Sequence, residues 1–348
     1  YTCDDISISN NVVMVDIYTW DECDNYALCQ VELTLTPDCD FGDDEGSNRI
    51  AGAIGTEFGK MVEDVNVSIS SAQPEYPISM MTDENGEYSS NGHLAGMNYE
   101  VSAYKNDDTR NGVSTLDILL IQRHILNIQN LTSPYQYIAA DVNSDGNITA
   151  ADLVDIRKLI LEVYFEYPNN TSWRFIDAAQ ALSMSNAFAF NEVIDILSLS
   201  SNMNDEDFIA SKIGDVNNSV VFNATGNDAE TRTGNLSINL TGVATAEGVS
   251  VDVTSANFNA IAGYQFTLKT NGMELASIEA GAIDMKDENV AVLDNNTITM
   301  SWNTVTPVTV ADEVLFTLNF EGNDIEKVLD MDITSEATIA EAYDADLS

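Results

Sequence analysis

Residues 141–152 are the part of the chain whose residue types and spacing best support chemistry. The oxygen-bearing side chains, at positions 1, 3, 5, 7, 9 and 12 of this stretch, are those of Asp141, Asn143, Asp145, Asn147, Thr149 and Asp152. Glycine stands at position 6 and an apolar residue at position 8. A hard cation such as Ca²⁺ takes about six to eight oxygen ligands, which a tight loop of this kind supplies. The sequence predicts a calcium-binding loop; the alternative is a solvated turn rich in aspartate and asparagine.

A second copy of the pattern lies upstream. Residues 111–126 mirror residues 148–161, and Asp117 aligns with Asp152, the last ligand of the loop. In each copy an apolar periodic segment follows directly, which predicts a loop and then a helix, with no helix before the loop. This duplicated loop and helix resembles the dockerin domain, in which two such units pack as a pseudo-symmetric pair. The resemblance covers residues 105–165 and implies calcium as the bound cofactor.

The first copy departs from the ligand pattern. Counting back from Asp117 places Asn106 at position 1, Asp108 at position 3 and Arg110 at position 5. An arginine cannot supply an oxygen ligand, and its positive charge opposes cation binding. Two interpretations remain open. Asn106, Asp108 and Asp117 form a weak calcium site, or the loop is empty and held by hydrogen bonds.

The dockerin resemblance also implies a surface for a cohesin-like partner. In that family the residues just before the last ligand, and basic residues further along each helix, face the partner. The matching positions here are Thr115, Leu116, Arg123 and His124 in the first copy, and Ala150, Ala151, Arg157 and Lys158 in the second. The alternative is that Leu116 and Ala151 pack within the chain.

Acidic residues dominate the composition. The 348-residue chain has 57 aspartates and glutamates against 13 lysines and arginines, a formal net charge of −44. Such a field repels nucleic acid and anionic membranes, and it attracts cations. Because 44% of the residues are apolar, the chain is expected to fold, as about two to four domains. No apolar run of about 20 residues occurs, so we expect no membrane span.

All four cysteines lie near the start of the chain, at Cys3, Cys23, Cys29 and Cys39. An even, clustered number in an acidic, lysine-poor chain indicates disulfides and an oxidising compartment. Three pairings are open, and one of them could join Cys23 and Cys29 across a predicted turn. A zinc site is the alternative, which the irregular spacing and the lack of a nearby histidine disfavour.

The sequence of the N-terminal part predicts β-strands. Residues 1–40 contain two, at 11–20 and 27–36, and resemble the end of an immunoglobulin-like domain of the hyalin-repeat kind. Residues 41–47 form an acidic linker. Residues 48–104 predict a small β-sandwich.

That predicted sandwich has recognisable internal features. Asn85-Gly86 predicts the turn of a hairpin, and alternation at Tyr99, Val101 and Ala103 predicts its closing strand. The pattern resembles the carboxypeptidase regulatory-like, transthyretin-type domain, which implies a spacer without catalytic residues.

The C-terminal part predicts a second β-domain. Residues 166–232 are less regular and are expected to be a connecting region. Within them, Asp215 and Asn217 imitate the start of a calcium loop but lack its remainder, so we expect a structural turn there. Residues 233–348 show short alternating strands separated by polar turns, which predicts a sandwich or jelly roll. They resemble the cohesin-like fold.

The expected fold class is therefore multidomain and mainly β, with immunoglobulin-like and jelly-roll or cohesin-like sandwiches and a small α-helical dockerin-like calcium-binding domain. The order of the units resembles the C-terminal region of large Bacteroidota surface proteins exported by the type IX pathway. That resemblance implies an extracellular or cell-surface location and a chain that is one segment of a larger precursor.

No enzymatic motif is recognisable. The zinc-protease, P-loop and nucleophile-elbow patterns are missing from the sequence, and His93 and His124 fall in different units. We therefore expect a non-catalytic, calcium-stabilised structural or adhesive segment. One alternative is assembly, in which the dockerin-like unit binds a cohesin-like domain in cis or in trans, with self-assembly into fibres. Another is glycan binding by the terminal sandwich, on fold analogy alone.

Overall fold

The computed structural model describes residues 12–20, 26–34, 47–222, 235–294 and 296–347. The first two segments are β1 (Val12–Trp20) and β2 (Tyr26–Thr34), which pair antiparallel along their whole length, as the alternation predicts. The cysteine predictions and the linker at 41–46 lie outside the described residues, apart from the backbone of Cys29 in β2.

The first β-sandwich consists of two four-stranded sheets with the orders β6-β3-β10-β8 and β5-β4-β7-β9. The strands of the first sheet are β6 (Glu87–Leu94), β3 (Ser47–Thr56), β10 (Phe208–Lys212) and β8 (Trp173–Asp177). Those of the second sheet are β5 (Ile78–Met81), β4 (Asn66–Ser71), β7 (Tyr99–Tyr104) and β9 (Val193–Ile196). The alternation of buried and exposed side chains orients β4, since Val67 and Ile69 are fully buried and Ser68 between them is partly exposed.

The described part of residues 166–232 differs from the predicted connecting region. β10 pairs with β3 in parallel and β9 pairs with β7 in antiparallel fashion, so segments 47–104 and 173–212 share one core. The helical unit is therefore inserted between strands of a single sandwich. β8, β9 and β10 contain only four or five residues each, and so short an alternation does not stand out from polar loops.

The turn at Asn85-Gly86 also differs from the prediction. β5 and β6, which flank it, belong to different sheets and do not pair with each other. The turn is closed by the Asp83 amide, which donates to the Glu87 carbonyl at 3.1 Å. Instead of making a hairpin, it carries the chain from one sheet of the sandwich to the other.

The helical unit follows β7. Its helices are α1 (Thr115–Ile125), α2 (Pro134–Ala140) and α3 (Ala150–Ile160). α1 and α3 begin with capping boxes, in which Ser114 pairs with Asp117 and Thr149 with Asp152. Contrary to expectation, a helix precedes the second loop: Ser133 caps α2, which ends directly before the loop. Ile118, Ile121, Ile156 and Leu159 form the centre of a shared apolar core.

The second β-sandwich follows, again with two sheets. The first contains β11 (Asn239–Ala244), β12 (Val249–Thr254), β17 (Val314–Phe320) and β14 (Leu275–Ala280). The second contains β15 (Val290–Asp294), β16 (Thr297–Val308), β13 (Ile261–Lys269), β18 (Asp332–Thr334) and β19 (Glu341–Asp344), with β18 and β19 both pairing with β13. The core lies between the sheets and includes Tyr264, Met300, Trp302 and Phe316. The mainly β, multidomain fold class with a small helical unit is confirmed.

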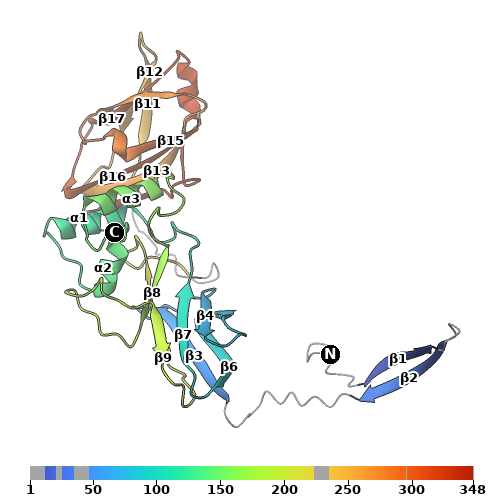
Figure 1. Cartoon of the computed structure of the whole chain (residues 1–348). Helices are drawn as coiled ribbons and strands as arrows, with labels where there is room; N and C mark the ends of the chain where they lie inside the picture. The colour runs from blue at the N-terminus through green and yellow to red at the C-terminus, as the bar shows by residue number, and fades with distance from the viewer. Residues whose placement is uncertain (1–11, 21–25, 35–46, 223–234, 295, 348) are drawn as a thin grey trace.

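The helical unit lies between the two sandwiches (Figure 1). α1 packs against β13 and β16, and α3 reaches β16 through the hydrogen bond from Arg157 to Asn303. As a result, both faces of β13 are buried. Tyr264 and Phe266 point into the sandwich core, while Gln265 and Thr267 on the opposite face are 4% and 0% exposed. A sheet with one free face would leave these polar residues in water.

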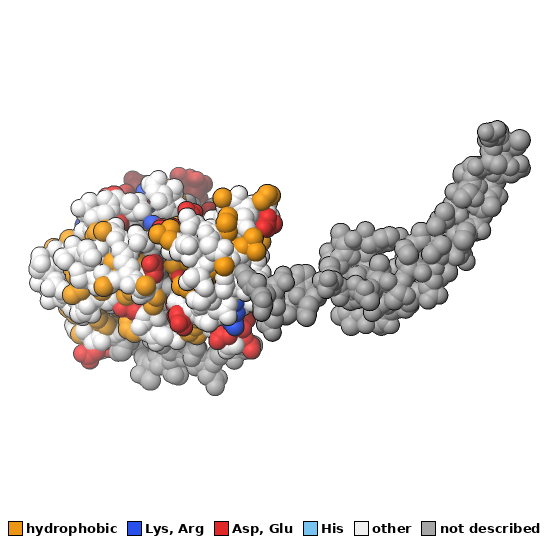
Figure 2. Space-filling view, turned by 60° about the horizontal axis from the view of Figure 1, so that its bottom comes forward, with side chains coloured by type: hydrophobic (Ala, Val, Ile, Leu, Met, Phe, Trp, Pro, Cys, Tyr) orange, Lys and Arg blue, Asp and Glu red, His pale blue; other side chains and the backbone are white. Residues whose placement is uncertain are grey.

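The surface reflects the composition. On the face shown in Figure 2, acidic side chains are spread over several regions and basic ones are few. Among the described residues, no helix has the length and apolar character needed to cross a membrane.

The shared core makes a prediction about Phe208 in β10, which is 1% exposed. Phe208→Ala should destabilise the first sandwich by about 3–5 kcal/mol, through lost burial and the cavity left behind. Hydrogen exchange should accelerate in β3 and β4, although both lie far upstream in sequence. Leu197→Ala, at a side chain that is 76% exposed, is the matched control. Equal exchange in the two variants would contradict the shared core.

Candidate functional site

The loop at 141–152 is organised around its first carboxylate. The two oxygens of Asp141 accept hydrogen bonds from the amides of Asp145 and Gly146, at 3.0 and 2.9 Å. The side-chain oxygen of Asn143 accepts a second bond from the Asp145 amide, at 3.0 Å. Ser144, between them, has a positive φ of 58°. These bonds curl the first half of the loop around its oxygen atoms.

The last carboxylate closes the loop. Asp152 is fully buried, and its oxygens accept hydrogen bonds from the amides of Asn143, at 3.2 Å, and Thr149, at 2.8 Å. One residue therefore caps α3 and ties its start to the first half of the loop. All six predicted ligand residues lie in this single loop, as expected from their spacing.

The electrostatics of this loop favour a cation. Burial, together with the charge of neighbouring aspartates, raises the pKa of Asp141 and of Asp152 above the ordinary value. Among the described residues, no group of three or more His, Cys, Asp and Glu side chains is arranged to hold a metal ion. The candidate ligand atoms of this loop also include the side-chain oxygen of Asn143, so the set consists of oxygen atoms and suits a hard ion.

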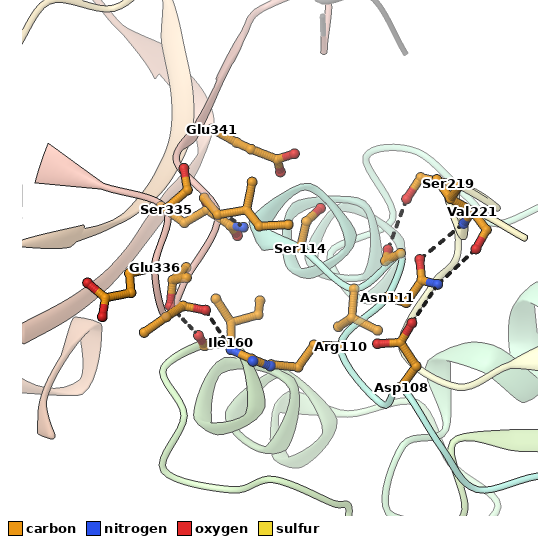
Figure 3. Close-up of a pocket in the computed structure, with 16 residues that line it drawn as sticks. Asp108, Arg110, Asn111, Ser114, Ile160, Ser219, Val221, Ser335, Glu336 and Glu341 are labelled. Atoms are coloured by element: carbon orange, nitrogen blue, oxygen red, sulfur yellow. Dashed lines mark hydrogen bonds between the residues drawn. The ribbon is translucent and has the colours of Figure 1, made fainter. Parts of the chain in front are cut away.

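The predicted ligands of the first loop are not brought together. The side-chain oxygen of Asn106 accepts from the amide of Ser172, at 2.8 Å. Asp108 accepts from the side-chain amide of Asn111, at 2.9 Å, and both lie on one side of the pocket in Figure 3. Neither residue hydrogen bonds to Asp117. The contiguous stretch 106–117 is thus held by hydrogen bonds, as one of the two interpretations expects.

Arg110, at the fifth position of that stretch, points away from it. Its guanidinium pairs with Glu162 and donates to the carbonyl of Ala337 at 2.6 Å. Arg110 therefore connects the helical unit to the second sandwich and has no part in a metal site.

Asp117 instead meets a segment that the sequence analysis treated as a structural turn. Its Oδ1 accepts from the amide of Val216 at 2.9 Å, and its Oδ2 accepts from the amide of Ser114 at 2.9 Å. Burial and the neighbouring charge of Asp215 raise the pKa of Asp117 well above its usual value. The signal that could have found this neighbour is a repeated tripeptide, Asp-Val-Asn, which begins at both 141 and 215.

The predicted partner-facing residue Thr115 contacts the second sandwich. Its amide donates to Oε1 of Gln265 at 2.6 Å, and its hydroxyl lies 2.8 Å from the hydroxyl of Ser301. Thr115 and Ser301 are fully buried. Gly263 leaves room for this approach, because a Cβ there would lie 3.3 Å from the methyl group of Thr115. Leu116 is 6% exposed, so the first turn of α1 is covered within the chain.

Arg157 in the second copy faces the same sheet. It donates to Oδ1 of Asn303 at 2.6 Å, and Asn303 in turn donates to Oε1 of Gln122 in α1 at 2.6 Å. Glu288 lies 3.8 Å from Arg157 but is 65% exposed, so this ion pair contributes little. Asn303 therefore bridges α1 and α3 from the sandwich side.

The other predicted partner-facing residues do not meet the sandwich through hydrogen bonds. Arg123 donates to Gln129, and Nδ1 of His124 accepts from the amide of Leu131, both within the helical unit. Lys158 donates to the hydroxyl of Tyr164. Ala150 and Ala151 are exposed.

The C-terminal end of α3 is completed by the second sandwich. The hydroxyl of Thr338 donates to the carbonyl of Ile160 at 2.6 Å, and that of Thr299 donates to the carbonyl of Leu161 at 2.7 Å. The last carbonyls of a helix lack partners within the helix, so these two threonines satisfy groups that would otherwise be buried unpaired.

A pocket of about 600 Å³ opens beside this interface. Arg110, Ser114 and Ile160 line it from the helical unit, and Glu336 and Glu341 from the second sandwich (Figure 3). Ser219 and Val221 complete its wall next to Asn111. The charged groups of its lining are three carboxylates and the guanidinium of Arg110, which is already paired with Glu162, so the pocket disfavours an anion.

Comparison with known proteins gives one family. Residues 106–161 match the family model of the dockerin type I domain. No curated protein matches the chain. A solved structure, that of BcpA, the major pilin subunit of Bacillus cereus, matches with 8% identity and a TM-score of 0.21. The match covers 80% of this chain but only 58% of the pilin, and it is too weak to carry an argument. Within a mainly β chain, the helical unit thus carries the sequence pattern of a dockerin type I domain.

Proposed function

We propose that the chain is a non-catalytic structural segment of an extracellular or cell-surface protein, in which a calcium-stabilised, dockerin-type helical unit holds two β-sandwiches together. The observation that carries the proposal is the burial of Thr115 between β13 and β16. Dockerin type I domains bind calcium and cohesin partners and are typically extracellular, which supports the cofactor and the location.

The contact between the helical unit and the second sandwich has the properties of a specific interface. Burying a polar group without a partner is costly, so a chance contact would leave such groups unpaired. Here Gln265 accepts from Thr115 and donates to the carbonyl of Ile339 at 3.2 Å. Thr267 donates to the carbonyl of Thr338 at 3.1 Å. The polar groups of β13 are therefore satisfied jointly by Thr115 of the helical unit and by residues 338–339 of the second sandwich.

This interface uses the surface that a dockerin would offer to a separate partner. Thr115, at a predicted partner-facing position of the first copy, is already covered by the chain's own sandwich, and Leu116 beside it is buried. The cohesin-type interaction is then made in cis, where the two partners are always at high effective concentration. The result is a rigid link between domains.

The proposed calcium site in this arrangement is the loop at 141–152. The loop joins α2 to α3, and α3 contacts the second sandwich through Arg157, Ile160 and Leu161. A cation among Asp141, Asp145 and Asp152 would offset their mutual repulsion and fix the start of α3. Binding to the folded state alone adds stability in proportion to the logarithm of the calcium concentration.

Calcium should therefore raise the melting temperature of the intact chain. At 100 times the dissociation constant, a single site adds about 2.7 kcal/mol, which corresponds to a rise of roughly 5–10 °C for a domain of this size. Calorimetry in calcium and in chelator measures the difference. The double variant Asp141→Asn/Asp145→Asn should abolish the calcium-dependent rise. Asp195→Asn, at an exposed position of β9, should retain it. Equal melting temperatures in calcium and in chelator would refute the calcium part of the proposal.

A second prediction concerns the interface and compares two variants, one at a buried and one at an exposed position. Thr115→Arg places a guanidinium in a fully buried position, so the helical unit should separate from the second sandwich. Small-angle scattering should then show a larger radius of gyration, and limited proteolysis should cut between the units. Ala150→Arg is the control, because Ala150 is the equivalent residue of the second copy and is exposed. Similar behaviour of both variants would argue against docking in cis.

Binding in trans through the second copy is the second candidate function. Ala150 and Ala151 are exposed, and Val154 one turn further is 45% exposed, so this face is open to another molecule. If it joined the second sandwich of a neighbouring chain, the mass in solution would increase with concentration in calcium, and Ala151→Arg would prevent the increase. A strictly monomeric species under these conditions would exclude self-assembly. No feature of the described residues adds to the glycan-binding alternative, which stays a prediction.

A further inference from the structure

Asp117 is a buried carboxylate whose partner comes from a distant part of the chain. It is fully buried at the start of α1, and the amide that donates to its Oδ1, that of Val216, lies 99 positions away. Asp215 is only 6% exposed. Two carboxylates therefore meet in the interior, at the junction of the helical unit and the segment that follows β10.

Residues 215–219 repeat the hydrogen bonds of the first half of the loop at 141–152. The carboxylate of Asp215 accepts from the amides four and five positions ahead, at 3.0 and 2.9 Å. The carboxylate of Asp141 accepts the same two bonds at 3.0 and 2.9 Å. Asn217 and Asn143 each accept from the amide two positions ahead, at 3.1 and 3.0 Å. The backbones agree as well, since the fourth residues, Asn218 and Ser144, have φ values of 56° and 58°.

The second half of the same loop comes from residues 112–117. Oδ2 of Asp117 accepts from the amide and hydroxyl of Ser114 at 2.9 and 3.1 Å. Oδ2 of Asp152 accepts the equivalent bonds from Thr149 at 2.8 and 3.4 Å. In both loops the other oxygen of the last carboxylate accepts an amide from the first half. Asp117 therefore makes the same kind of hydrogen bond to residues 215–219 that Asp152 makes to residues 141–145.

The two halves are joined at Gly112, which aligns with position 7 of the contiguous loop. Its carbonyl accepts from the hydroxyl of Ser219 at 2.9 Å. Gly112 has a φ of 81°, and a Cβ there would lie 2.6 Å from Oδ2 of Asp215. Only glycine therefore allows residues 112–117 to approach residues 215–219 this closely.

We infer that residues 112–117 and 215–219 together form a second calcium loop, split between two segments of the chain. Its donors would be the side-chain oxygens of Asp215, Asn217, Ser219 and Asp117 and the carbonyl of Gly112, a set entirely of oxygen that suits calcium. Arg110, which the contiguous count places at a ligand position, is replaced by Ser219. The inference rests on the proposed calcium function and assigns a second site to it.

A split loop would have a structural consequence that a contiguous loop lacks. Residues 215–219 follow β10, the strand that completes the first sandwich, and Asp117 begins α1, which contacts the second sandwich. A cation held by both segments would therefore cross-link the inserted helical unit to the sandwich into which it is inserted. The loop at 141–152 has all its predicted ligands in one segment and would form no such cross-link.

Two lysines offer a competing explanation for the buried carboxylates. Lys60 donates to the carbonyls of Asn218 and Val220 at 2.9 and 3.2 Å, and Lys212 donates to that of Asp108 at 3.0 Å. Their ammonium groups lie beside the split loop and could balance its charge without a metal. If the lysines balance the charge, the chain should bind one calcium ion, at 141–152. If the split loop binds calcium, the chain should bind two.

Native mass spectrometry and titration calorimetry of the full chain with calcium chloride distinguish these explanations. We expect two ions in the wild type and one in Asp141→Asn/Asp145→Asn. Adding Asn217→Ala and Ser219→Ala to that variant should remove the last ion. Both residues are partly exposed, so the fold should survive, and circular dichroism in chelator checks this. Asp108→Asn is the matched control and should keep two ions.

Terbium luminescence gives an independent measurement at the split loop. Tyr167 lies beside it, since a Cβ on Gly214 would be 2.3 Å from the Tyr167 hydroxyl. In the Asp141→Asn/Asp145→Asn background, excitation of tyrosine should sensitise bound terbium, and Tyr167→Phe should weaken the emission at least severalfold. One ion in the wild type, or two ions in which Asp108→Asn removes one, overturns the split loop. No calcium at all would instead overturn the proposed function.

Discussion

The contact of α1 and α3 with the polar face of β13 and β16 sets the arrangement of the helical unit and the second sandwich. A sheet normally leaves one face to water when its other face lines a core. Here the outer face is polar yet buried, so its groups need partners, which come from the helical unit and from residues 338–339 of the second sandwich itself. Thr115, Asn303 and Thr338 supply or receive those hydrogen bonds. The second sandwich and the helices therefore determine each other's position.

The insertion of the helical unit makes this constraint act on both sandwiches. The chain leaves the first sandwich after β7, forms α1, α2 and α3, and returns to it through β8, β9 and β10. Both ends of the inserted unit are thus fixed to one core. Because the opposite side of the unit is fixed to β13 and β16, the three parts are linked through side-chain packing as well as through the backbone.

Buried carboxylates are the electrostatic consequence of this architecture. The chain has a net charge of −44. Among the residues whose burial is described, most acids are at least partly exposed, but Asp117, Asp152 and Asp215 are placed in the interior. Such groups need amide donors, a cation or both. The amides are supplied by capping boxes and tight turns. Calcium is the ion that this chemistry favours.

Features whose residues lie close together in the chain could be predicted from the residues alone. Twelve consecutive residues contain all the predicted ligands of the loop at 141–152, and the apolar periodicity around Asp117 and Asp152 indicates α1 and α3, because hydrogen bonds between near neighbours depend on local spacing. Which distant segments meet became known from the fold. The pairing of β10 with β3, the cover over Gln265 and the approach of Asp215 to Asp117 all join residues far apart in sequence. Short strands carry little information about their partners, since pairing is selected by packing over the whole core. The repeated Asp-Val-Asn indicates a second loop start at 215, but it does not say which distant segment completes that loop.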